Sequence, residues 1–254
     1  MPETDYPDDR PPRNRNDYLQ QTHWPLNGLV FLLPLLVFYH VGLLWCGQQA
    51  MYTLLAETHL SWLLQFFIGT TTPYLPAAAV VAVLLVQHAA RKDPWRFRPG
   101  VLIGMVGESA VWMMPLLALA LLVNKMDLAA LAAPDVSVVG TSMQRVLLAV
   151  GAGIYEEFIF RLLFIGLAVL LLVNIFNLRK EPVALAAVVV SGVCFSLYHC
   201  SAGQLSNELP FPWFEFVFRA GAGVYLGLVY LYRGFAIAVG AHAAWDIYVF
   251  LFAA

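Results

Sequence analysis

Long apolar runs, separated by short polar stretches, dominate the chain after residue 24. A helix needs about 20 apolar residues to cross a hydrocarbon core of about 30 Å. On that measure the pattern predicts about seven membrane-spanning helices, or eight if one ambiguous segment also crosses. The predicted spans are 29–46, 74–90, 101–123, 146–173, 182–200, 213–232 and 235–252.

The ambiguous segment, 48–67, is apolar overall but carries Glu57, Thr58, His59 and Gln65. Such a pattern is typical of a helix at the membrane interface or of a marginal eighth span. An eighth span would put the basic residues of the N-terminal tail on the opposite side of the membrane from the later basic loops. This argues against a full crossing.

The domain organisation follows from the same pattern. Residues 25–254 show no repeat of fixed period and no long polar insertion, so we expect one all-α domain, a polytopic bundle of transmembrane helices. Residues 1–24 are rich in Pro, Asp, Arg and Asn and lack the apolar core of a signal peptide. We expect them to form a disordered polar tail.

Composition agrees with a membrane protein. The 254 residues are 61% hydrophobic and 12% charged, whereas soluble domains have about 25% charged residues. The net charge of -2 gives no basic excess for nucleic acid, so we expect the lipid bilayer and no nucleic acid as a partner. Three cysteines, without metal-like spacing, predict no disulfide framework.

Lysine and arginine in short loops mark the cytoplasmic side of a membrane protein. With seven spans, the clusters before and between the spans all fall on one side. This pattern predicts a multi-pass protein with its N-terminus cytoplasmic and its C-terminus outside. The membrane that we expect is a bacterial cell membrane. The basic residues concerned are Arg10, Arg13, Arg15, Arg91, Lys92, Arg96, Arg98, Arg179, Lys180 and Arg233.

Charges inside the fourth predicted span are its most costly feature. The stretch 155–161 reads Tyr-Glu-Glu-Phe-Ile-Phe-Arg, and each ionised group at the bilayer centre costs about 2.5 to 3.5 kcal/mol on the lenient insertion scale. Glu157 and Arg161 are four residues apart with the acid first, the favourable order for an ion pair. Glu156 is rotated by roughly 100° on the helix and lacks that partner. It must face something else.

Later spans carry more ionisable residues. Glu215 and Arg219 repeat the four-residue spacing, so we expect a structural pair along one helix. His242 and Asp246 project from one face of the last span, and His199 ends the fifth.

One glutamate, two histidines and an aspartate on three helices can activate water and stabilise an oxyanion. The same groups can bind zinc or iron, and each histidine alone can serve as a hydrogen bond between helices. Buried carboxylates also relay protons in transporters, although no inverted repeat is visible here. The residues alone leave these alternatives open.

Three short motifs occur in order on three separate apolar segments: Glu-Glu-x-x-x-Arg, Phe-x-x-x-His and His-x-x-x-Asp. With them the chain resembles the CAAX-protease and bacteriocin-processing (CPBP, Abi-like) family of intramembrane glutamic endopeptidases, which includes the type II CAAX prenyl proteases. The resemblance covers about the last 110 residues, with a protease core at about 143–254. Glu108, in the first half, receives no role. The motif residues are Glu156, Glu157, Arg161, Phe195, His199, His242 and Asp246.

This resemblance implies an endopeptidase that cleaves a membrane-proximal protein or peptide, of CAAX type or in peptide processing. Glu156 and His199 would activate water, and His242 with residue 246 would contact the oxyanion. No metal or other cofactor is implied, with zinc as the alternative. Many members carry Asn at the last position, whereas an ionised Asp246 cannot donate a hydrogen bond. It would have to be protonated, orient His242 or act as a ligand.

The resemblance also implies that Glu157, Arg161 and Phe195 support the helix arrangement. Two other functions stay open, a proton- or ion-coupled transporter and a non-catalytic immunity or scaffold protein. The seven-span topology places the end of the fifth span, with His199, at the outer face. We therefore expect an exported peptide or a C-terminal anchor as substrate and not a prenylated cytosolic protein.

Overall fold

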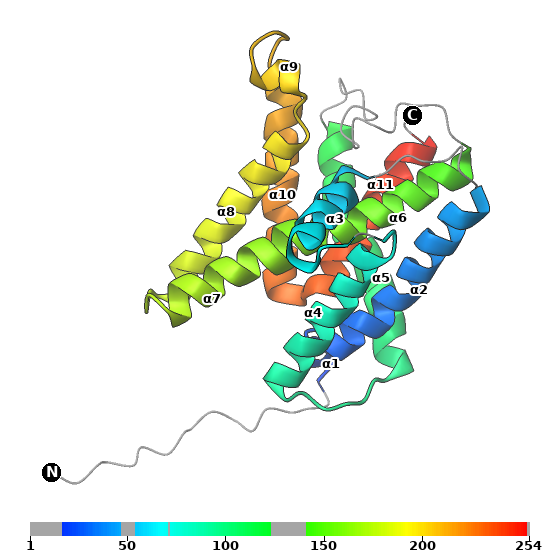
Figure 1. Cartoon of the computed structure of the whole chain (residues 1–254), viewed down its shortest axis with the longest axis vertical. Helices are drawn as coiled ribbons and strands as arrows, with labels where there is room; N and C mark the ends of the chain where they lie inside the picture. Colours follow the sequence, from blue (N-terminus) through cyan, green and yellow to red (C-terminus); the bar gives the residue numbers. More distant parts are fainter. Residues whose placement is uncertain (1–16, 47–53, 71, 123–140, 253–254) are drawn as a thin grey trace, which may run out of the picture.

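A computed structural model describes residues 17–46, 54–70, 72–122 and 141–252, and within these residues the regular elements are all helices (Figure 1). The all-α prediction is therefore confirmed. Most of the predicted tail, residues 1–16, lies outside the described residues. The remainder differs from the expectation, because α1 (Tyr18–Gln21) is helical and is capped by the side chain of Asp17.

Each predicted span coincides with helical structure. Within the described residues, α2, α5, α8, α10 and α11 are long and apolar enough to cross a membrane, and α4 is a shorter apolar helix. The chain is thus an integral membrane protein. The bounds are α2 Pro25–Cys46, α4 Leu75–Arg91, α5 Pro99–Leu122, α8 Lys180–Tyr198, α10 Trp213–Arg233 and α11 Phe235–Phe252.

The fourth predicted span is a run of three helical pieces: α6 (Ser142–Glu157), the π-helix η4 (Phe158–Ile165) and α7 (Gly166–Asn174). α6 begins at a capping box formed by Thr141 and Gln144. The π-helix begins directly after Glu157. π turns are rare in proteins as a whole, but those that occur are frequently at functional sites. The position of this π-helix therefore indicates that Glu156 and Glu157 belong to a functional site.

The ambiguous segment forms α3 (Leu55–Ile68), whose 14 residues span about 21 Å at 1.5 Å per residue. This is too short for the hydrocarbon core, so the described helix does not form an eighth span. Its aromatic side chains Trp62, Phe66 and Phe67 are exposed, and the ring of His59 hydrogen-bonds the hydroxyl of Tyr198 at 2.7 Å. α3 therefore packs beside the end of α8.

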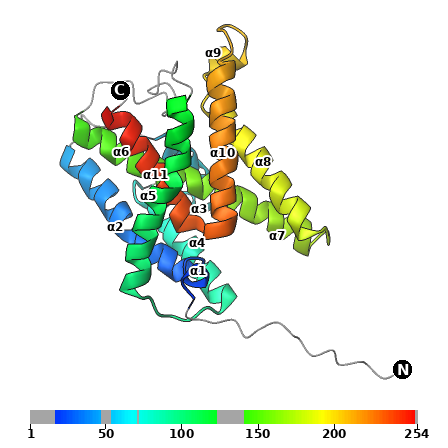
Figure 2. The ribbon, with the colours of Figure 1, turned by 180° about the vertical axis from the view of Figure 1, so that it is seen from behind.

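Close backbone contacts hold the helices that carry the motifs. α11 packs mainly against α6 and α5, and α10 packs against α8 (Figures 1 and 2). A Cβ on Gly153 of α6 would lie 2.9 Å from the backbone nitrogen of Ala243, and a Cβ on Gly192 of α8 would lie 2.8 Å from that of Val224. Small residues at such crossings allow membrane helices to approach closely.

The two ends of the molecule differ in charge. In both ribbon views the α4–α5, α7–α8 and α10–α11 connections lie at one end with α1, and the short helix α9 (Ala202–Leu205) lies at the other (Figures 1 and 2). The described basic loop residues 91–98, 179–180 and 233 therefore share one end. That this end faces the cytoplasm stays a prediction.

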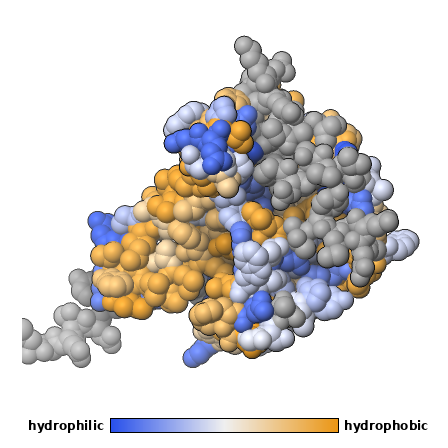
Figure 3. Space-filling model, turned by 45° about the horizontal axis from the view of Figure 1, so that its top comes forward, coloured by the Kyte–Doolittle hydropathy of each residue, from blue (hydrophilic) through white to orange (hydrophobic). Residues whose placement is uncertain are grey.

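The outer surface of α7 and α8 is apolar, as expected for a face in contact with lipid (Figure 3). The exposed side chains of this face include Leu170, Leu171, Leu185, Val189 and Val190.

Candidate active site

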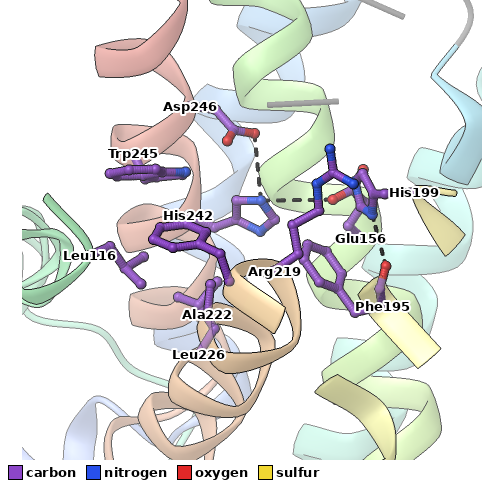
Figure 4. A pocket seen from close by; sticks show the side chains of 11 residues that line it. Leu116, Glu156, Phe195, His199, Arg219, Ala222, Leu226, His242, Trp245 and Asp246 are labelled. Carbon is purple, nitrogen blue, oxygen red and sulfur yellow. Dashed lines mark hydrogen bonds and ion pairs between the residues drawn. The ribbon is translucent and has the colours of Figure 1, made fainter. Parts of the chain in front are cut away.

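The four residues predicted to be catalytic line one buried pocket (Figure 4). Glu156 lies at the end of α6, His199 at the C-terminal cap of α8, and His242 with Asp246 on α11. The structure thus brings together side chains from three separate helices. The pocket has a cavity volume of about 20 Å³, which is room for about one water molecule. Its apolar wall comprises Leu116, Phe218, Ala222, Leu226 and Trp245.

Glu156 stands between the two histidines. Its Oε1 is 3.7 Å from Nε2 of His199, and its Oε2 is 3.7 Å from Nε2 of His242. Both distances exceed those of a direct hydrogen bond, about 2.7 to 3.2 Å. A single water can approach either pair of atoms at hydrogen-bond distance, so the carboxylate and an imidazole can share one water.

A backbone carbonyl orients His199. Its Nδ1 lies 2.8 Å from the carbonyl oxygen of Phe195, which can only accept, so Nδ1 carries the proton. In the neutral ring the other nitrogen, Nε2, then has the free lone pair, and this is the atom that faces Glu156. His199 can therefore accept a proton from a water in the pocket.

Glu157 orients His242, a contact that the sequence did not reveal. Nδ1 of His242 donates to Oε1 of Glu157 at 2.7 Å. Nε2 of His242 thus points into the pocket, 3.5 Å from Oδ2 of Asp246. The first and last motifs are joined through this bond, which is buried on both sides.

Arg161 lies on η4 and contacts residues of α6, α8 and α10. Its Nη1 forms the predicted ion pair with Oε1 of Glu157 at 3.1 Å, and its Nη2 donates to the carbonyl of Gly223 on α10 at 3.2 Å. The guanidinium also stacks over the ring of Phe195, 4.8 Å from its centroid. The expectation that Glu157, Arg161 and Phe195 hold the helix arrangement agrees with these contacts.

Arg219 reaches into the same pocket from α10 and is buried, although its spacing from Glu215 predicted a structural role (Figure 4). Glu215 does not line the pocket. A signal was present in the sequence, because the small residues Ala222 and Gly223 mark a closely packed helix face and Arg219 lies three and four residues before them.

Glu108 lies outside the pocket, in a separate polar network. Its carboxylate accepts from Nε and Nη2 of Arg233, from the hydroxyl of Tyr18 at 2.7 Å and from Nε1 of Trp112 at 2.9 Å. Burial, and secondarily the bond to Glu108, raises the pKa of Tyr18 to about 12, so its hydroxyl stays a donor at neutral pH. This network joins α1, α5 and α10.

In the described part of the chain, no set of three His, Cys, Asp or Glu side chains is arranged as metal ligands. The predicted independence from metal is a question for chelation in solution.

Among families of known proteins, the Rce1-like family of type II CAAX prenyl endopeptidases matches residues 139–248. The match includes every residue of the three motifs and, apart from Leu116, the whole lining of the pocket. No curated protein and no solved structure matches the chain.

Proposed function

We propose that the chain is an intramembrane endopeptidase of glutamic type, on the premise that its residues 139–248 match the Rce1-like family of type II CAAX prenyl endopeptidases. Its substrate is a protein or peptide cleaved near the membrane surface. The observation that carries the proposal is the separation of 3.7 Å between Glu156 Oε1 and His199 Nε2, across a cavity with room for one water.

In the proposed reaction, the water between Glu156 and His199 loses a proton to one of them as its oxygen bonds to the carbonyl carbon of the scissile peptide. The carbonyl oxygen becomes an oxyanion in the tetrahedral intermediate. The carbon–nitrogen bond then breaks, and the proton taken from water passes to the leaving amine.

His242 is placed to stabilise the oxyanion. With a proton on both ring nitrogens, its Nδ1 donates to Glu157 while Nε2 donates to the developing negative charge. A protonated Asp246, 3.5 Å from that Nε2, would supply a second donor. Arg219 is a cation at the edge of the same space. These groups form an oxyanion site opposite the base.

The test is cleavage of candidate C-terminal peptides by the purified full-length protein in detergent. Glu156→Gln and His199→Ala should each lower kcat/KM by about 10²- to 10⁴-fold, because each removes a partner of the attacking water. Glu208→Gln is the matched control, since Glu208 is exposed and does not line the pocket, so its loss should leave cleavage unchanged. Full activity in both pocket variants would overturn the proposal and favour a transporter or a non-catalytic protein.

The proposal includes independence from metal, which chelation tests separately. Dialysis against a chelator should leave cleavage by the full-length protein intact. If zinc copurified at one ion per chain and its removal abolished cleavage, the proposal would be wrong on this point. The two histidines and the carboxylates would then be metal ligands.

A further inference from the structure

A second cavity, of about 260 Å³, lies at the basic end of the molecule, away from the catalytic pocket. It is enclosed by the turn between α1 and α2, the C-terminal half of α4, the start of α8 and the turn between α10 and α11. Its volume is below the 300 to 1,000 Å³ of pockets that enclose a whole drug-sized molecule. It therefore suits part of a ligand, such as a headgroup.

Two basic side chains reach this cavity from separate elements, Arg91 from α4 and Lys180 from α8. Asp93 forms an ion pair with Nε of Arg91 at 2.9 Å but does not line the cavity. His23 also lines it, and its Nε2 donates to the carbonyl of Tyr232. Burial lowers the pKa of His23, so this ring is neutral at pH 7 and the positive charge comes from Arg91 and Lys180.

The remaining wall combines an amide with apolar side chains. Gln87 supplies further hydrogen-bonding groups, and Leu84, Leu162 and Phe235 supply an apolar surface. A ligand that satisfies both parts is anionic at one end and apolar at the other. Guanidinium and ammonium groups are the usual partners of phosphate in proteins.

The location narrows the choice of ligand. The cavity lies where the basic connections gather, at the ends of the spans, which is the level of lipid headgroups. Basic pockets between transmembrane helices at this level bind anionic lipids. We propose that the cavity holds the phosphate headgroup of an anionic phospholipid between Arg91 and Lys180, with the acyl chains leaving along the apolar wall. This proposal does not depend on the proteolytic function.

The experiment titrates the purified full-length protein with phosphatidylglycerol or with phosphatidylcholine of the same acyl chains, and native mass spectrometry measures the bound fraction. The wild type should bind phosphatidylglycerol about 30-fold more tightly, from about 1 kcal/mol for each basic residue. Arg91→Gln combined with Lys180→Gln should abolish this preference. Persistence of the preference in that variant would overturn the proposal.

The matched control is Arg96→Gln combined with Arg179→Gln, which removes the same charge from the same end of the molecule without touching the cavity. This control should keep the wild-type preference for phosphatidylglycerol. An equal loss of the preference in the control would show that general attraction to the basic surface, and not the cavity, causes it. The exchange of Arg91→Lys with Lys180→Arg should also keep the preference. If the double Gln variant does not fold, each single variant should lose about fivefold.

Inorganic phosphate distinguishes a lipid from a free anion. Because phosphate lacks the apolar part, it should not displace phosphatidylglycerol at equal concentration. Displacement at equal concentration would overturn the lipid assignment and leave a site for a free anion.

Discussion

Two adjacent glutamates, Glu156 and Glu157, have different surroundings. Glu156 faces the pocket and both histidines, whereas Glu157 is fully buried and holds His242 and Arg161. This difference arises because neighbouring residues on a helix point roughly 100° apart. The same acidic side chain is thus a candidate base at one position and a positioning group at the next.

Glu157→Gln should lower kcat about 10- to 100-fold with little change in KM, the range seen when a group that orients a reactive ligand is removed. An amide still accepts from Nδ1 of His242 but no longer offers a charge to Arg161. Steady-state kinetics of Glu157→Gln and Glu156→Gln, measured under the same conditions, provide the comparison. A loss as large as that of Glu156→Gln would show that Glu157 itself takes part in the reaction.

Asp246→Asn tests the oxyanion role of Asp246. A carboxyl group donates a hydrogen bond only when protonated, so its contribution falls as the pH rises through its pKa, whereas an amide donates at every pH. The Asn variant should therefore keep cleavage activity and lose less of it at high pH than the wild type. A pH profile of kcat/KM measures this, and an inactive Asn variant would instead indicate that the carboxylate is required.

At the scale of the elements, the contact between α8 and α10 sets where His199 stands relative to Glu156. Gly192 and Gly223 meet at this crossing, with a Cβ on Gly223 only 2.8 Å from Cα of Gly192. The π-helix after Glu157 changes the rotation of α7, which leads to α8. The site thus depends on helix rotation and close approach as much as on the motif residues.

Gly192→Ala should destabilise the protein by about 1 to 3 kcal/mol, because the new Cβ meets backbone atoms of α10 that can move only with the helix. The rate of cleavage should also fall, because His199 lies at the end of the same helix, α8, and moves with it. Gly221→Ala is the control, since a Cβ there meets nothing within 4 Å and alanine is the better helix former. Thermal unfolding in detergent measures both, and equal stability of the two variants would contradict the packing argument.

For the whole molecule, the bundle separates a basic end from the end that carries α9 (Figures 1 and 2). His199 lies at the α9 end of α8, so the pocket lies closer to that end than the basic loops do. One basic residue of the topology argument is less informative than expected, because Arg233 is buried and bound to Glu108. The other described basic loops still agree on one side.

Cysteine accessibility tests the orientation in a background with Cys46, Cys194 and Cys200 replaced. A cysteine at exposed Ser206, next to α9, should react with an impermeant thiol reagent in intact cells. A cysteine at Arg179, at the basic end, should react only after lysis. The reverse labelling pattern would place the pocket on the cytosolic side and restore prenylated cytosolic proteins as substrates.

Much of the architecture and of the site could be predicted from local spacing. The seven helical segments follow from the length of apolar runs, and the Glu157–Arg161 pair follows from a separation of four residues on one helix. The three motifs also contain five of the residues that line the pocket, namely Glu156, Phe195, His199, His242 and Asp246. These features depend on distances along the chain, which the sequence contains directly.

Other features depended on how the helices pack and rotate against one another. The bond from His242 to Glu157, the entry of Arg219 into the pocket and the pairing of Arg233 with Glu108 each join groups from elements distant in sequence. Hydropathy shows that a charged side chain in a span needs a partner, because hydrocarbon offers none. It does not show which partner, since that depends on helix rotation and on the few crossings where small residues let the backbones meet.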